Sequence, residues 1–254
     1  KFAPGLSISS DFYNIKVKNV ISSPSAQTII NTCVDLPSLA NPFCALFQRY
    51  VGPGPNAEGD NPSDILSNST IQFPLNFASL VRRGIDTQIS YRRELYKGLR
   101  FDGTLIWTHN LKNSNYLNPV DPTFENRILG ELGDPRDEFR LDTDWALGDF
   151  TFGYRLQYIG SMYTSTYEAF NSLQGRPPEN SDTVAVEKYP VVTYSDVRLE
   201  WRPKNLFGKE FRLYGGVDNI FDKRPPFGLT GVGAGSAIYD VRGRSYYLGT
   251  RVRF

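Results

Sequence analysis

The segment from Arg244 to Phe254, at the end of the sequence, alternates apolar and polar side chains. Successive side chains of a β-strand point to opposite faces of a sheet, so the segment predicts a strand with one apolar and one polar face. The apolar phase ends on an aromatic residue, which is typical of strands that leave a membrane at its interface. This phase comprises Tyr246, Leu248, Thr250, Val252 and Phe254.

The same alternation recurs along the chain and predicts about eight strands. The other candidates lie near residues 5–20, 85–92, 99–107, 139–147, 150–158, 191–202 and 211–218. Short turns alternate with long loops rich in Pro, Gly and Asn, near residues 21–67, 110–134, 164–190 and 219–243. This rhythm is typical of outer-membrane barrels, whose turns are short on one side of the membrane and long on the other. We therefore expect an all-β fold, a transmembrane antiparallel β-barrel domain over residues 1–254.

Composition narrows the class further. No stretch approaches the roughly 20 apolar residues that a membrane-spanning helix requires, which excludes a helical membrane protein. The chain is rich in aromatic residues, with 17 Phe, 15 Tyr and 3 Trp, as a barrel with a lipid-facing surface would be. A single His and a single Met offer little for a metal site or a histidine-based enzyme, and a net charge of +1 makes no case for nucleic acid. We expect no enzyme activity, cofactor, metal or nucleic-acid partner.

The polar phase of the strands carries many charges of both signs. A soluble barrel that buried these charges would need a partner for each, and one that exposed them would have to bury the aromatic phase against something else. Lipid outside and a wet or protein-filled lumen inside resolve the conflict. The residues predicted to face the lumen are Asp142, Asp144, Arg155, Asp196, Arg198, Glu200, Arg202, Arg212, Asp218, Arg251 and Arg253.

Two segments near the end of the chain carry a family resemblance. Residues 219–226 (NIFDKRPP) and 239–254 (YDVRGRSYYLGTRVRF) resemble the C-terminal end of TonB-dependent outer-membrane receptors, with Ile220 in place of Leu as the visible departure. Residues 23–27 (SPSAQ), 41–44 (NPFC), 76–80 (NFASL) and 83–86 (RGID) also resemble barrel segments of this family. The resemblance spans essentially the whole chain.

The resemblance implies a larger protein. Receptors of this family have a plug domain, a TonB box and a barrel of 22 strands, so we expect these eight strands to be the C-terminal third of such a barrel, with the plug outside this chain. It implies uptake of a scarce nutrient, such as a ferric siderophore, across the Gram-negative outer membrane. The implied partners are membrane lipid, the rest of the receptor, TonB through the plug, the transported solute and the barrel assembly machinery. That machinery would read the closing strand, through Tyr246, Leu248, Val252 and Phe254.

Two other classes of protein compete with a transporter. An autonomous eight-stranded outer-membrane protein with a structural or adhesive role would pair its inward charges into a filled core. A soluble lipocalin-like module is disfavoured, because its outward faces would be too aromatic for water.

The long loops hold the remaining candidate sites. Ser23 with Pro24 predicts the start of a short helix, as N-cap and first helical residue. An exported loop in an oxidising compartment favours a disulfide between Cys33 and Cys44. The alternative is two free thiols packed among apolar neighbours, namely Leu36, Leu39, Phe43 and Phe47.

Other residues invite a site but have an ordinary explanation. Tyr163, Tyr167 and Phe170 could stack on a ligand, although aromatic residues are expected at a membrane interface in any case. His109 lacks metal-binding or catalytic partners at a useful spacing, so we expect a hydrogen-bonding role. Asp142 and Asp144 could suggest a glycosidase pair, but inward arginines favour an ion network. The glycines at 228, 231, 233 and 235 lack the strand-to-helix transition of a phosphate-binding loop and indicate an extracellular loop.

Overall fold

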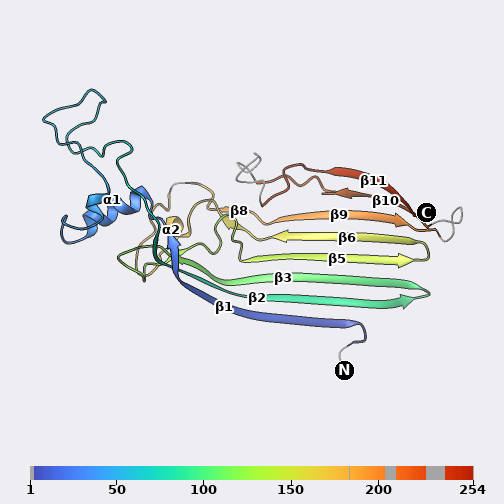
Figure 1. Cartoon of the computed structure of the whole chain (residues 1–254). Coiled ribbons are helices and arrows are strands. Elements are labelled where there is room, and N and C mark those ends of the chain that lie inside the picture. The colour runs from blue at the N-terminus through green and yellow to red at the C-terminus, as the bar shows by residue number, and fades with distance from the viewer. Residues whose placement is uncertain (1–2, 183, 204–209, 227–237, 254) are drawn as a thin grey trace. The chain divides into compact units, whose positions relative to one another are not determined.

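The computed structural model describes residues 3–182, 184–203, 210–226 and 238–253. The chain divides into two compact units. The first comprises Lys1–Asn14, Arg82–Asn113 and Ile128–Phe254. The second comprises Ile15–Val81 and Ser114–Arg127. The main element is an antiparallel sheet with the strand order β1-β2-β3-β5-β6-β9-β10-β11 (Figure 1). Its strands are β1 (Leu6–Ser22), β2 (Leu75–Tyr96), β3 (Leu99–Tyr116), β5 (Asp137–Leu147), β6 (Phe150–Ile159), β9 (Val192–Trp201), β10 (Glu210–Asp218) and β11 (Ser245–Arg253).

Consecutive long strands are neighbours in this sheet, which confirms the predicted all-β class and the eight main strands. The β2–β3 connection is a two-residue turn in which Lys97 and Gly98 have φ values of 43° and 83°. Positive φ at both central residues defines the type I′ turn, whose twist matches that of the flanking strands. Gly148, with φ of 57°, begins the equally short β5–β6 turn. The connections at the opposite strand ends are long, as predicted.

The pairing register separates the two predicted phases onto two faces. Phe152 lies opposite Trp145 on one side and Leu199 on the other, and Leu248 lies opposite Gly215. Residues directly opposite in antiparallel strands share a face. The apolar face is open, with Leu248 79% exposed. Such a continuous apolar surface indicates a protein or membrane environment in place of water.

Two boundaries differ from the sequence prediction. The loop expected at residues 110–134 begins later, because β3 continues to Tyr116 and its end pairs with the short strand β4 (Asn126–Arg127). Polar residues such as Asn110 and Asn115 hide the alternation there, while backbone hydrogen bonds to the partner strands continue. The loop expected at 21–67 lies between Ser22 and Leu75, the ends of β1 and β2.

The first unit has a small apolar core where β6 and β9 reach their loop ends. Buried Ile159, Val192 and Tyr194 meet Met162 of the short strand β7 (Met162–Tyr163) and Tyr239 of the last loop. The short strand β8 (Lys188–Tyr189) pairs with β7, and the one-turn helix α2 (Tyr167–Phe170) lies between them in sequence. Parts of the β6–β9 and β10–β11 connections thus pack together at this end of the sheet.

The second unit contains the helix α1 (Ala26–Asp35) and the 3₁₀ turn η1 (Cys44–Leu46). The predicted helix forms, but its N-cap is Ser25, whose hydroxyl accepts a hydrogen bond from the Thr28 amide at 3.1 Å. The expectation of Ser23 as N-cap is therefore wrong, because it is the second serine of the Ser-Pro-Ser run whose hydroxyl bonds the amide three residues further on, that of Thr28. In the described residues, no helix has the length and apolarity to cross a membrane.

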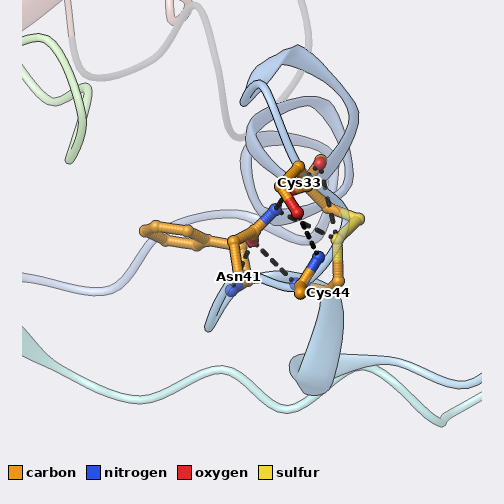
Figure 2. Close-up of a disulfide and its surroundings, with 6 residues drawn as sticks. Cys33, Asn41 and Cys44 are labelled. Atoms are coloured by element: carbon orange, nitrogen blue, oxygen red, sulfur yellow. Dashed lines mark hydrogen bonds between the residues drawn. A yellow bond between two sulfur atoms is a disulfide. The ribbon is translucent and has the colours of Figure 1, made fainter.

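A disulfide joins α1 to η1 through Cys33 and Cys44, as predicted, with the two Cα atoms 4.8 Å apart (Figure 2). Asn41 lies beside it and donates hydrogen bonds to the Cys33 carbonyl (3.1 Å) and the Ser38 carbonyl (2.7 Å). The side-chain carbonyl of Asn41 accepts hydrogen bonds from the backbone amides of Phe43 and Cys44. The disulfide and this amide close the segment between the two cysteines around a core of Ile29, Cys33 and Phe47.

Candidate functional site

The charged residues of the polar face form rows that run across the strands. In one row Asp142 of β5 lies opposite Arg155 of β6, which lies opposite Asp196 of β9. In the next row Asp144 lies opposite Gly153, and Gly153 lies opposite Arg198. That row continues through Gly216 of β10 to Tyr247 of β11.

Each arginine in these rows reaches a carboxylate on another strand, Arg155 on the neighbouring β5 and Arg198 on β5 across β6. The Arg155 guanidinium donates to Asp142 at 2.7 Å, and Arg140 contacts the other oxygen of the same carboxylate at 2.8 Å. Arg198 donates to Asp144 at 2.7 Å. Asp142 and Asp144 therefore belong to an ion network, an arrangement unlike the two differently tuned carboxyl groups of a glycosidase.

Glycines make the second row possible. A Cβ at Gly153 would lie 2.8 Å from the Asp144 carboxylate and 3.1 Å from the Arg198 Nε, so the absence of a side chain lets this pair meet. A Cβ at Gly216 would lie 2.5 Å from the Tyr247 hydroxyl, which occupies that space. Arg198 and Tyr247 thus lie flat along the sheet instead of projecting from it.

A polar pocket of about 230 Å³ lies over these rows. Asp196 accepts a hydrogen bond from the Asn219 amide at 2.8 Å, and Asp218 accepts a long one from the Ser245 hydroxyl at 3.4 Å. The pocket is shallow, charged and open, which suits hydrated polar contacts with a second surface. Its charged lining comprises Asp142, Asp144, Arg155, Asp196, Arg198 and Asp218.

The turn end of the polar face is basic. Glu200 is 2% exposed and is contacted by Arg202 and Arg212. Arg212 lies opposite Arg251 in the β10–β11 register. Arg253 lies 3.8 Å from Glu210, with both side chains largely exposed. All eleven residues predicted to face the lumen thus belong to the charged rows or their turn end.

The apolar face carries aromatic residues at two levels. Near the short turns, the Phe101 and Trp145 rings are 4.5 Å apart, and Trp201 packs against Phe150 and Phe211. Near the long loops, Phe139 stacks on Tyr158 at 4.8 Å, with Trp107 directly opposite Phe139.

The spacing of these levels fits a bilayer. Phe150 to Tyr158 spans nine residues, close to the roughly 9–11 residues with which a tilted strand crosses the hydrocarbon core. The apolar band of a membrane barrel is ~25 Å tall and is bordered by aromatic girdles on both sides. The fold, its two faces and the aromatic levels together define the wall of a transmembrane β-barrel.

His109 lies at the loop end of this wall. Its Nδ1 is 2.6 Å from an Asp137 carboxylate oxygen, which also accepts a hydrogen bond from the Trp107 indole at 3.2 Å. The structure therefore gives His109 a hydrogen-bonding partner of the kind expected. In the ranges that the structure describes, no group of three or more His, Cys, Asp or Glu side chains could hold a metal ion.

The three loop aromatics proposed to contact a substrate come together in one cluster. The Tyr163 ring lies 5.6 Å from Tyr167 and 5.9 Å from Phe170, and the Lys188 ammonium lies 4.5 Å from its centre. Phe170 is buried, so it packs the cluster and presents little surface to a ligand. Tyr163 and Tyr167 are half-buried.

Acidic residues beneath this cluster are partly desolvated. Glu131 accepts a hydrogen bond from the Tyr167 amide at 2.8 Å. Burial raises the pKa of the Glu131 carboxyl, although that hydrogen bond works in the opposite direction. Burial likewise raises the pKa of Asp134, whose carboxylate accepts a 2.5 Å hydrogen bond from Asn113.

Some predicted residues are placed and others are not. Tyr246, Leu248 and Val252 lie on the apolar face of β11, opposite Val217, Gly215 and Phe211. Phe254 and the glycines at 228–235 lie outside the described residues. The sequence prediction missed Arg140 and Tyr247, which belong to the polar phase of their strands and could have been found by extending it. Gly153 and Gly216 gave no signal, because their role depends on the register.

Comparison with known proteins identifies the family. The family model of the TonB-dependent receptor-like β-barrel matches residues 1–220. The chain therefore belongs to the TonB-dependent receptor-like β-barrel family, as the sequence motifs predicted. Comparison with curated proteins gave no match.

Solved structures of receptors share the fold. A ferric enterobactin receptor mutant from Pseudomonas aeruginosa aligns with a TM-score of 0.54 and 18% identity, over 99% of this chain and 29% of the receptor. The ferric-catecholate import receptor Fiu from Escherichia coli K12, in a closed form, aligns with a TM-score of 0.43 and 14% identity, over 99% of this chain and 25% of that chain. This chain thus spans less than a third of the length of either receptor.

Proposed function

We propose that this chain forms part of the barrel wall of a TonB-dependent outer-membrane transporter that imports a scarce nutrient of the ferric siderophore class. The observation that carries the proposal is the two-faced sheet in a member of this family, with apolar and aromatic residues on one face and paired charges on the other. The apolar face would meet lipid, and the polar face would line the lumen.

The polar face would hold a plug domain. Ion pairs such as Arg155–Asp142 are half-exposed, so they can exchange partners with water or with a plug at small cost. Polar, hydrated contacts of this kind rearrange without unfolding the wall, which a transporter needs when TonB acts on the plug. We propose that the wall itself performs no covalent chemistry.

The order of strands supports a larger barrel over the autonomous alternative. An eight-stranded closed barrel would require β1 to pair with β11, yet in the described pairing these two strands are the opposite ends of the sheet. Further strands supplied by the rest of the receptor would satisfy both edges. We propose that they do so, and that β11 is read by the barrel assembly machinery through Tyr246, Leu248, Val252 and the terminal Phe254.

A receptor of similar fold supports the proposed substrate class. It is a ferric enterobactin receptor. The loop aromatics Tyr163, Tyr167 and Phe170 would lie on the extracellular side, where a ligand first arrives.

Uptake in cells tests this function. The gene that contains this chain is deleted in its host, and energy-dependent uptake of ⁵⁵Fe bound to a catecholate siderophore is measured, with a strain lacking TonB as reference. The proposal predicts that uptake falls to the level of the strain lacking TonB and is restored by the full-length gene. Unchanged uptake of every ferric siderophore tested would contradict the siderophore assignment.

A further inference from the structure

The turn end of the polar face has more cationic than anionic side chains. Glu200, the one nearly buried carboxylate there, is shared by Arg202 and Arg212. Arg251 lies directly opposite Arg212 on the neighbouring strand and is exposed. Two guanidinium groups therefore share one carboxylate, and a third lies beside them on β11.

This arrangement is unfavourable for the wall alone. Side chains directly opposite in antiparallel strands have Cβ atoms about 5 Å apart, and like charges on such a pair are destabilising. Arg212 is oriented by its contact with the Tyr214 ring, 5.4 Å from the ring centre, so it has little freedom to turn away. In the described part of the chain, no carboxylate contacts Arg251.

Another like-charged pair on the same face shows how the wall usually resolves such a conflict. Asp102 and Asp144 lie directly opposite each other on β3 and β5. Arg92 contacts Asp102 at 2.5 Å, and Arg198 donates to Asp144 at 2.7 Å, so each carboxylate has its own counter-ion. Of the two arginines at positions 212 and 251, Arg212 contacts a carboxylate, that of Glu200, and shares it with Arg202.

We propose that the arginine cluster of Arg202, Arg212 and Arg251 is a docking site for a carboxylate-bearing segment of the polypeptide that fills the lumen. The inference rests on the proposed function, because it requires an occupant on the polar face. A carboxylate placed between Arg212 and Arg251 would accept charge-assisted hydrogen bonds from both. The charge of the wall thus specifies an Asp or Glu side chain of the occupant at the turn end.

Zero-length cross-linking tests the site in the full-length receptor in outer-membrane fractions. Arg251→Lys places a primary amine at the cluster, and a water-soluble carbodiimide joins that amine to any carboxylate in contact with it. Mass spectrometry of the digested protein then identifies the partner. Arg253→Lys is the matched control for reagent access, because position 253 lies beside the wall's own Glu210.

The expected result is a cross-link from position 251 to an Asp or Glu outside residues 1–254, while position 253 joins to Glu210. The proposal is overturned if position 253 reacts and position 251 yields only Glu200, another wall carboxylate or no product. Siderophore uptake by the Arg251→Lys receptor, measured in parallel, tests the proposed transport function separately from the docking site. Uptake without a cross-link outside the wall overturns the docking site alone.

Discussion

Tyr247 lies across Gly216 of the neighbouring strand, where a Cβ would be 2.5 Å from the tyrosine hydroxyl oxygen and 2.5 Å from the Val197 carbonyl oxygen. The ring fills the space that the missing side chain leaves on the polar face. The same relationship recurs one row away, where the Tyr214 ring lies over Gly249. In both places an aromatic residue and a glycine on paired strands occupy one volume.

This relationship predicts that Gly216→Ala destabilises the wall by about 1–3 kcal/mol through overpacking. Moving the tyrosine alone gives no relief, because the carbonyl of Val197 is backbone and belongs to the next strand. The urea midpoint of the full-length receptor in detergent measures the effect. Gly54→Ala, at a position with open space around it, is the control and is expected to unfold like the parent.

Substitution of Glu200 should cost far more than that of an exposed acid on the same face. Glu200→Gln removes the buried carboxylate that Arg202 and Arg212 share, and a hydrogen bond to a charged group contributes about 1.5–3 kcal/mol. The exposed Asp102, paired with Arg92, is the comparison, and its loss should cost ~1 kcal/mol or less. Equal urea midpoints for Glu200→Gln and Asp102→Asn would contradict the burial argument.

The disulfide should stabilise its own loop and leave the sheet unaffected. In the chain-entropy model, closing a loop of the observed separation of 11 contributes about 3 kcal/mol. Reduction, or paired Cys33→Ser and Cys44→Ser substitution, should therefore speed proteolysis between β1 and β2, with heat resistance of the barrel unchanged. Asn41→Ala, with the disulfide intact, tests the amide separately and should have a smaller effect on cleavage. Equal cleavage of the oxidised and reduced loops is the result that contradicts a structural role.

The folded loop that buries Glu131 should lose stability as the pH rises. Burial raises the folded-state pKa of Glu131 above its ordinary value of 4.5, so the folded loop binds a proton more tightly than the unfolded loop does. The stabilising effect is present below that value and is lost as the pH rises through the folded pKa. Hydrogen exchange of the Tyr163 amide, which donates to the Gly130 carbonyl next to Glu131, should show less protection across this range once it is corrected for its intrinsic pH dependence. Glu131→Gln should remove the trend, and a trend that survives this substitution would assign it to another group.

Strand alternation was enough to predict most of the fold, because each face of the sheet meets a different environment. The alternation of apolar and polar residues is clear in the sequence over Phe139–Leu147 and Phe150–Tyr158. The pairing register of β5 and β6 places the two sets on opposite faces of the sheet. The prediction was wrong at residues 110–116, where mostly polar residues obscure the alternation while backbone pairing and side-chain hydrogen bonds such as Ser114 to Glu125 continue the strand. At Ser25, a local hydrogen bond selects one of two nearby serines, which composition cannot distinguish.

The site was less predictable than the fold. The charged phase located the eleven wall residues, but which arginine meets which carboxylate depends on the register. Arg198 reaches Asp144 across Gly153, two strands away, and no sequence spacing encodes that contact. The loop aromatics were predicted individually, whereas their packing around Tyr163 depends on how the long connections fold.

We propose that one face of this sheet meets lipid and the other a polar lumen, and two neighbouring residues of β6 can distinguish these environments. Leu156 lies in the apolar phase and Gln157 in the polar phase. Nitroxide labels are attached at Leu156→Cys and Gln157→Cys in the reconstituted full-length receptor, and their collisions with oxygen and with a water-soluble nickel chelate are compared. We expect the label at position 156 to collide more often with oxygen than with the nickel chelate. At position 157 we expect a higher ratio of nickel-chelate to oxygen collisions. Equal ratios at the two positions, or the reverse order, would contradict it.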